Sequence, residues 1–162
     1  MATVTDLCKD LPCQTFPAGA CVLEEGKRAG VLYVLANGSV EIVKGEFQIT
    51  TVSEPGSFFG EVSVLLGMPH MATVRTLEDS SFYVAENPLE FLQSQPVIAL
   101  SLARLLAKRL QFVTSYLVDL KQQFAEHDNH LGIVDEVLES LVHHQDVESS
   151  PGSDRHPDPK VE

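Results

Sequence analysis

Residues 58–74 read FFGEVSVLLGMPHMATV, the most informative segment of the chain. Gly60 and Glu61 open a single apolar helical turn, after which Gly67 returns the chain to an extended segment. Gly60 lets backbone N–H groups approach an anion closely, and the start of the short helix adds partial positive charge. Glu61 supplies a carboxylate that can accept hydrogen bonds from hydroxyl groups; the alternative is that it satisfies backbone donors at the helix start. The stretch predicts a site for a small anion.

The same stretch resembles the phosphate-binding cassette of the cyclic-nucleotide-binding domain family. The family pattern runs Phe-Gly-Glu, a Leu-Leu pair and Pro-Arg-x-Ala-Thr-Val. The matching residues are Phe59-Gly60-Glu61, Leu65-Leu66, Pro69 and Ala72-Thr73-Val74, and His70 stands where the pattern has arginine. Further similarity lies in Phe16–Gly19, Glu25-Gly26, Leu32–Leu35 and Gly38–Glu41, and in a helical segment at Ala103–Leu110. The resemblance covers roughly residues 15 to 126.

The resemblance implies a regulatory module whose ligand is a cyclic nucleotide, cAMP or cGMP, with no other cofactor. The residues that it places at the ligand are Phe59, Gly60, Glu61, Val62, His70, Met71, Ala72 and Thr73. In this family the base contacts the long C-terminal helix, and ligand binding shifts that helix relative to the rest of the domain. Polar residues of the helix that are candidates to meet the base are Thr114, Ser115, Gln122 and Gln123.

His70 decides how far that function carries over. A neutral imidazole donates one hydrogen bond, whereas a permanently charged arginine holds two phosphate oxygens at once. Three interpretations stay open: a weakened cyclic-nucleotide site, a site for another small anion, or a surface imidazole in a domain that binds nothing. Arg75 does not replace the missing guanidinium, because strand alternation places it on the opposite face.

The sequence predicts a mainly β fold with some α structure. Across residues 15–86, short β-branched and aromatic runs are broken by Gly-rich turns, as at Asn37-Gly38 between two strands. Many short strands of this kind indicate a β-roll (a double-stranded β-helix or jelly-roll) rather than a parallel sheet. We expect this roll to carry the phosphate-binding cassette and to be followed by a long C-terminal helix.

The periodicity becomes helical after Asn87, where Asn-Pro predicts a cap and first turn. A short helix is expected to end near Gln95, and a long one to run from Val97 to about Glu126. One stripe of the long helix, which we call the seam, has heptad spacing; its residues are Leu106, Leu110, Val113, Leu117, Leu120 and Phe124. This spacing favours a parallel coiled-coil homodimer. The alternative is that the seam packs on the roll of its own chain.

The expected domain organisation has four parts. Residues 1–14 are a short leader, and 15–126 are the cyclic-nucleotide-binding-like domain with its dimerisation helix. Residues 127–145 form an accessory amphipathic helix that folds back on the roll, extends the dimer or docks on another, unidentified protein. Residues 146–162 are expected to be a disordered acidic tail. The last 36 residues, from His127, are too few and too acidic for the DNA-reading domain that many relatives attach after the long helix.

Composition predicts a cytoplasmic protein. The 162 residues carry a formal net charge of −12, which argues against nonspecific binding to nucleic acid or to acidic membranes. No apolar run is long enough to span a membrane, and the N-terminus lacks a signal-peptide pattern. The three cysteines, Cys8, Cys13 and Cys21, cannot all pair within the chain, so we expect reduced thiols.

No catalytic residue or metal ligand is expected. His70 is the only histidine of the roll, and a metal site needs several histidines or carboxylates that converge. His127, His130, His143 and His144 lie later in the sequence and are expected to be solvated rather than metal-bound. The three cysteines faintly resemble the N-terminal iron–sulfur cysteines of one branch of the superfamily, but a cluster needs four ligands. Two hypotheses remain: a dimeric, non-enzymatic nucleotide sensor, or a ligand-free scaffold for dimerisation and protein interaction.

Overall fold

The computed structural model describes residues 2–124 and 131–143. The chain divides into two units, Met1–Leu105 and Leu106–Glu162. In chain order the elements are α1 (Val4–Leu7), β1 (Cys13–Phe16), β2 (Cys21–Leu23), β3 (Leu32–Asn37), β4 (Val40–Lys44), β5 (Phe47–Val52), β6 (Phe58–Phe59), α2 (Glu61–Leu66), β7 (Thr73–Thr76), β8 (Ser80–Ala85), α3 (Pro88–Ser94), α4 (Pro96–Gln123) and α5 (Leu131–His143). The predicted tail, residues 146–162, lies outside the described residues, as do His127, His130 and His144.

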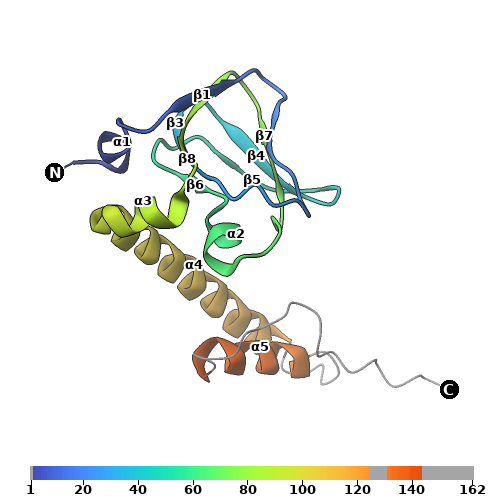
Figure 1. Ribbon diagram of the computed structural model, residues 1–162. Coiled ribbons are helices and arrows are strands. Elements are labelled where there is room, and N and C mark those ends of the chain that lie inside the picture. The colour runs from blue at the N-terminus through green and yellow to red at the C-terminus, as the bar shows by residue number, and fades with distance from the viewer. Residues whose placement is uncertain (1, 125–130, 144–162) are drawn as a thin grey trace. The chain divides into compact units, whose positions relative to one another are not determined.

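Two four-stranded sheets form the first unit (Figure 1). One sheet has the order β1-β8-β3-β6 and the other the order β2-β7-β4-β5, and the strand pairs in both are antiparallel. Most neighbours in the sheets are far apart in sequence, as in the pairing of β1 with β8, whereas β4 and β5 are consecutive. The mainly β roll with a long C-terminal helix, which the sequence predicted, is therefore confirmed.

The core of the roll forms around Phe82, which is fully buried in the middle of β8. Its ring meets those of Phe16, Tyr33 and Phe59 edge to face, at centroid distances of 5.6, 5.9 and 6.1 Å. Edge-to-face packing of this kind stabilises aromatic pairs beyond the area that they bury. Aliphatic side chains from both sheets complete the cluster, namely Leu23, Leu35, Val40 and Val74. Because Phe59 is the last residue of β6, the core also fixes the point where α2 begins.

The predicted turn at Asn37-Gly38 is confirmed and is very tightly packed. Gly38 has φ of +109°, and a Cβ built on it would lie 2.2 Å from Oγ of Ser80. The same hydroxyl accepts a hydrogen bond from the backbone N–H of Ser39 at 3.2 Å. Glycine at position 38 therefore lets the β3–β4 turn pack directly on the start of β8.

The predicted helices are present with small shifts in their ends. α3 begins at Pro88, with Asn87 as its cap residue, but the Asn87 side chain makes no capping hydrogen bond. α4 begins one residue before the predicted start, at Pro96. The predicted leader contains the short helix α1, and β1 begins inside it at Cys13. None of the described helices is long and apolar enough to cross a membrane.

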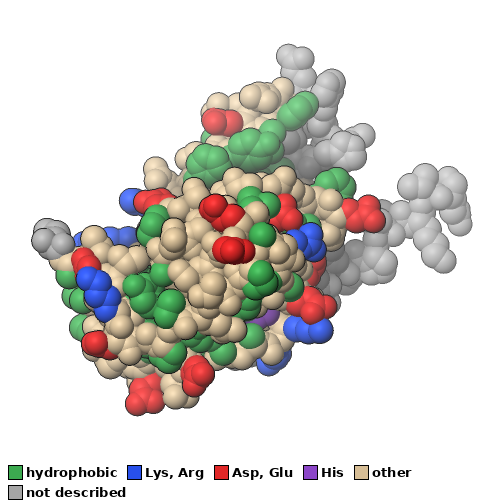
Figure 2. Space-filling model, turned by 90° about the horizontal axis from the view of Figure 1, so that it is seen from above, with side chains coloured by type: hydrophobic (Ala, Val, Ile, Leu, Met, Phe, Trp, Pro, Cys, Tyr) green, Lys and Arg blue, Asp and Glu red, His purple; other side chains and the backbone are tan. Residues whose placement is uncertain are grey.

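The second unit contains the remainder of α4 and the helix α5. Lys121 near the end of α4 forms an ion pair with Asp135 of α5. Several large apolar side chains of α4 are exposed, among them Phe112 and Tyr116. On the face shown in Figure 2, Lys and Arg side chains lie toward the margins, whereas Asp and Glu also occupy the middle.

Candidate functional site

The chain turns sharply at Gly60, between the buried strand β6 and the start of α2. Gly60 has φ of +83°, in the left-handed region that residues with a Cβ avoid. A Cβ at this position would lie 2.8 Å from the carbonyl oxygen of Val31 and 3.7 Å from Cε1 of His70. The turn therefore requires glycine, and its backbone lies close to the His70 ring.

Glu61 follows as the first residue of α2, and its side chain is only 7% exposed. A carboxylate in such a position must be satisfied within the protein, and Glu61 does have interaction partners in the chain. Burial lowers the pKa of the nearby His70 imidazole, and the negative charge of Glu61 opposes that shift. Gly60 and Glu61, which precede His70 by ten and nine residues in the sequence, are thus its neighbours in space.

His70 is buried, with 6% of the residue exposed. The interpretation of His70 as a surface imidazole is therefore wrong, because the loop of residues 24–29 covers it. The backbone N–H of Ala29 donates a hydrogen bond to Nε2 of the ring at 3.3 Å. Two backbone hydrogen bonds fix the main chain of the same residue. The N–H of Gly26 donates to the His70 carbonyl at 2.8 Å, and the N–H of His70 donates to the Lys27 carbonyl at 2.9 Å.

The protonation state of His70 follows from this geometry. A ring nitrogen can accept a hydrogen bond only when it carries no proton, so Nε2 is unprotonated and the neutral ring has its proton on Nδ1. Burial lowers the pKa of His70, and the negative charge of Glu61 partly opposes that shift. Arg75 adds no charge here, since it lies on β7 and pairs with Glu41 at 3.4 Å.

The other predicted ligand residues lie around this group. Val62 and Ala72 are half-buried, and Met71 is 51% exposed, with its carbonyl accepting a hydrogen bond from Nζ of Lys44 at 3.2 Å. Thr73 is the first residue of β7, and its hydroxyl accepts a hydrogen bond from the backbone N–H of Glu25 at 3.1 Å. The 24–29 loop is thus attached to the cassette at both His70 and Thr73.

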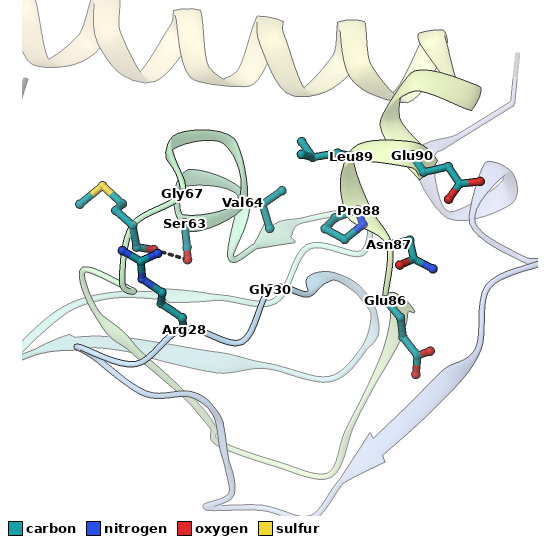
Figure 3. A pocket seen from close by; sticks show the side chains of 11 residues that line it. Arg28, Gly30, Ser63, Val64, Gly67, Glu86, Asn87, Pro88, Leu89 and Glu90 are labelled. Atoms are coloured by element: carbon teal, nitrogen blue, oxygen red, sulfur yellow. Dashed lines mark hydrogen bonds between the residues drawn. The ribbon is translucent and has the colours of Figure 1, made fainter. Parts of the chain in front are cut away.

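A cavity of about 500 Å³ lies on another side of α2 (Figure 3). Its lining includes Arg28 and Gly67 at one end and Glu86 and Leu89 at the other, and Met68 also lines it. None of the eight predicted ligand residues lines it. Sequence alone does not single out Arg28, because an arginine among Glu, Gly and Lys in a loop is typical of a solvated charge.

The cysteines are free thiols in different surroundings. Cys8 is fully buried, and burial raises its pKa to about 11, whereas Cys13 and Cys21 are exposed. A thiol with so high a pKa is a poor nucleophile at neutral pH. Among the described residues, 2–124 and 131–143, no group of three or more His, Cys, Asp or Glu side chains is placed to hold a metal ion.

The candidate base contacts and all of the seam except Phe124 lie on α4, and Phe124 follows the last residue of that helix. Leu110 and Val113 are each 45% exposed and Phe124 is 49% exposed, while Leu106, Leu117 and Leu120 are half-buried. The Thr114 hydroxyl donates to the carbonyl of Leu110 at 2.8 Å, so it is bonded to its own helix. Ser115, Gln122 and Gln123 are exposed.

The amino-acid sequence of this region matches a known family. Residues 13–89 match the family model described as "Cyclic nucleotide-binding domain". This part of the chain belongs to that family. The cyclic nucleotide-binding domain, as we now call it, includes β1 to β8, the cassette and the start of α3.

Bacterial regulators are among the relatives of this domain. Over 125 residues, the chain is 27% identical to the CRP-like cAMP-activated global transcriptional regulator of Mycobacterium tuberculosis. This match covers 74% of this chain and 56% of that protein. Over 102 residues, it is 29% identical to the cyclic AMP receptor protein of Thermus thermophilus, and this match covers 59% of this chain and 47% of that protein. The chain thus spans about half the length of these two relatives, and neither of their names describes an enzyme.

A solved structure supports the same assignment. The catabolite activator protein of Thermus thermophilus superposes with a TM-score of 0.63 at 26% sequence identity. The match covers 71% of this chain and 57% of that one. The cyclic nucleotide-binding domain therefore has the CRP-type fold.

Proposed function

We propose that this domain is a non-enzymatic regulatory module that binds cAMP or cGMP in the cassette and acts in the cytoplasm. The observation that carries the proposal is the grouping of Gly60, Glu61 and His70 within a cassette that matches the family. The two curated relatives are named for cAMP, which supports the choice of ligand. Another small anion of similar charge would use the same groups.

Each residue of the group has a role in this proposal. The close turn at Gly60 lets backbone N–H groups reach the cyclic phosphate, and Glu61 accepts hydrogen bonds from the sugar hydroxyl. His70 stands where an arginine would hold the phosphate. A charge-assisted bond is worth about 1.5–3 kcal/mol against about 1 kcal/mol for a neutral one, so affinity should be roughly tenfold weaker than with arginine. Phe59, Val62, Met71, Ala72 and Thr73 shape the surroundings of the ligand.

Titration calorimetry with cAMP and with cGMP tests this function. His70→Arg should tighten binding roughly tenfold, because a permanent charge replaces a neutral donor. Glu61→Gln should weaken it, and Glu54→Gln, on an exposed turn, is the matched control that should leave it unchanged. If the protein and His70→Arg both bind neither nucleotide, the sensor function is excluded.

We further propose that the seam of α4 forms a homodimer through which the domain signals. The exposure of Leu110 and Val113 supports this, because an apolar heptad stripe of this kind packs best against a partner helix. Leu110→Glu should convert a dimer to a monomer in analytical ultracentrifugation, while Gln111→Glu, beside the seam, should not. A wild-type chain that sediments as a monomer at all concentrations would contradict the homodimer.

One observation favours the alternative, a ligand-free scaffold that docks an unidentified protein partner. Nε2 of His70 already accepts a hydrogen bond from Ala29, so half of the ring's capacity is used within the chain. A thermal shift with cAMP and cGMP separates the two functions, since a ligand that binds only the folded state raises the melting temperature. The sensor predicts a concentration-dependent rise with at least one nucleotide, and the scaffold predicts none.

A further inference from the structure

His70 is attached to the 24–29 loop by three hydrogen bonds, and only one of them uses the imidazole. The two backbone bonds, with Gly26 and Lys27, do not depend on the charge of the ring. The bond from Ala29 N–H to Nε2 does depend on it. We propose that this bond is a proton-controlled latch, in which protonation of His70 frees the loop at Ala29 and turns the imidazole into a charged donor for an anionic ligand. The inference rests on the proposed nucleotide site and specifies its regulation.

The latch can exist in only one protonation state. An imidazolium carries protons on both nitrogens, so its Nε2–H would point at the N–H of Ala29 and the hydrogen bond would be replaced by a repulsive contact. The backbone bonds keep the main chain of His70 in place, so relief must come from rotation of the ring or withdrawal of Ala29.

Charged groups on each neighbouring element bear on this titration. Glu61 of α2 favours the imidazolium, whereas burial of the ring favours the neutral form. On the 24–29 loop, Lys27 is paired with Glu24 at 2.7 Å, and Arg28 lines the cavity on the other side of α2. The carboxylate of Glu25 accepts from the backbone N–H of Gly45 at 2.9 Å, and Lys44 donates to the Met71 carbonyl.

The sign of the effect follows from linkage. The free protein holds His70 neutral at pH 7, since its pKa lies below the ordinary value of about 6.5. An anionic ligand beside the ring adds negative charge and raises that pKa, so binding takes up a proton. By reciprocity, affinity rises as pH falls between the pKa of the complex and the pKa of the free protein, by up to tenfold per pH unit, and is constant outside that window.

Calorimetry with cAMP at about pH 8 and about pH 5.5 tests the latch. A cyclic phosphodiester keeps its negative charge across this range, so the ligand itself does not titrate. We expect wild-type protein to bind several-fold more tightly at the lower pH, and the binding heat to depend on the ionisation heat of the buffer because a proton is taken up. His70→Arg should bind tightly at both values. His70→Gln, whose amide oxygen can accept from Ala29 but never gains charge, should bind weakly at both.

The outcomes separate this inference from the proposed function. Equal wild-type affinities at the two pH values, with no buffer dependence, overturn the latch and leave the nucleotide site in place. An unchanged pH dependence in His70→Gln also overturns it, because another group would then be titrating. If neither wild type nor His70→Arg binds cAMP or cGMP at either pH, the nucleotide site and the latch fail together. Without ligand, we expect an NMR titration to show that the chemical shift of the Ala29 amide changes with the same pH dependence as the signals of the His70 ring.

Discussion

The cassette and the part of α4 beyond Leu105 use their side chains in opposite ways. In the cassette, His70 and Thr73 are bonded to the 24–29 loop, and Glu61 is buried with partners in the chain. On α4, apolar side chains such as Leu110 and Phe112 stay largely exposed. The cassette has its geometry fixed by its own chain, so its function depends on which groups remain to meet a ligand. The role of α4 beyond Leu105 depends instead on which surface packs against its exposed apolar side chains.

The largest effect on stability should come from the core on which the cassette stands. Phe82→Ala removes the ring that contacts Phe16, Tyr33 and Phe59, and should lower the free energy of unfolding by about 3–5 kcal/mol. Phe47→Ala is the matched control, because Phe47 is 80% exposed on β5 and its loss should change stability by less than about 0.5 kcal/mol. Urea denaturation measures both. Equal losses would show that burial does not distinguish these two rings.

The turn before α2 should give the next largest effect. Gly60→Ala forces a Cβ into a left-handed conformation and to 2.8 Å from the Val31 carbonyl, whereas Gly67→Ala meets only the backbone penalty, with nothing within 4 Å. We expect about 1–2 kcal/mol for Gly67→Ala and a larger loss for Gly60→Ala. Thermal denaturation of the two variants gives the difference. Similar losses would mean that the contact with Val31 relaxes without cost.

A smaller effect should appear in the pH dependence of stability. The pKa of His70 is lower in the folded chain than its ordinary value of about 6.5, so between these two values the unfolded chain binds a proton that the folded chain does not. The free energy of unfolding should therefore fall as pH drops through about 6.5 and stop falling below the folded pKa. His70→Gln lacks the part of this pH dependence that comes from His70. Subtracting the free energy of unfolding of the variant from that of the wild type removes the contribution of the other histidines. A difference that stays constant from about pH 8 to about pH 5 would contradict the lowered pKa.

The smallest effect should come from α4. Phe112 is 74% exposed and lies outside the seam, so Phe112→Ser should change the free energy of unfolding by less than about 0.5 kcal/mol. It should also leave self-association unchanged if Leu110 and the rest of the seam form the dimer. Sedimentation of Phe112→Ser beside Leu110→Glu measures this. Dissociation by Phe112→Ser would place the interface on the stripe of Phe112 and Tyr116 instead.

The sequence was sufficient for the fold because its local signals and the family pattern agree. Gly38 marked a turn that only glycine permits. Small errors occurred in the predicted ends of helices and strands, because the contacts of one or two residues determine where an element ends. Asn87 is the cap residue of α3 but makes no side-chain capping bond, which residue preference alone does not reveal. The predicted domain boundaries stay a prediction.

The candidate site was harder to predict than the fold. The pattern identified Gly60 and Glu61, but the surroundings of His70 are made by Ala29, 41 residues earlier in the chain. Strand alternation could not report on this histidine, since it lies in a loop between α2 and β7. Thr114 shows the opposite difficulty: its type suggested a ligand contact, yet its hydroxyl is bonded to its own helix.

The 24–29 loop has a consequence for how quickly its backbone exchanges hydrogen with solvent. Its residues are exposed, but the amides of Glu25, Gly26 and Ala29 each donate a hydrogen bond to the cassette. Such amides should be protected from deuterium although they lie at the surface, because exchange requires each bond to open. Protection at Gly26 reports on main-chain docking alone, whereas protection at Ala29 also reports on a side chain. The ratio of the exchange rates of these two amides therefore reports on the hydrogen bond to the imidazole, and it can be measured without any ligand.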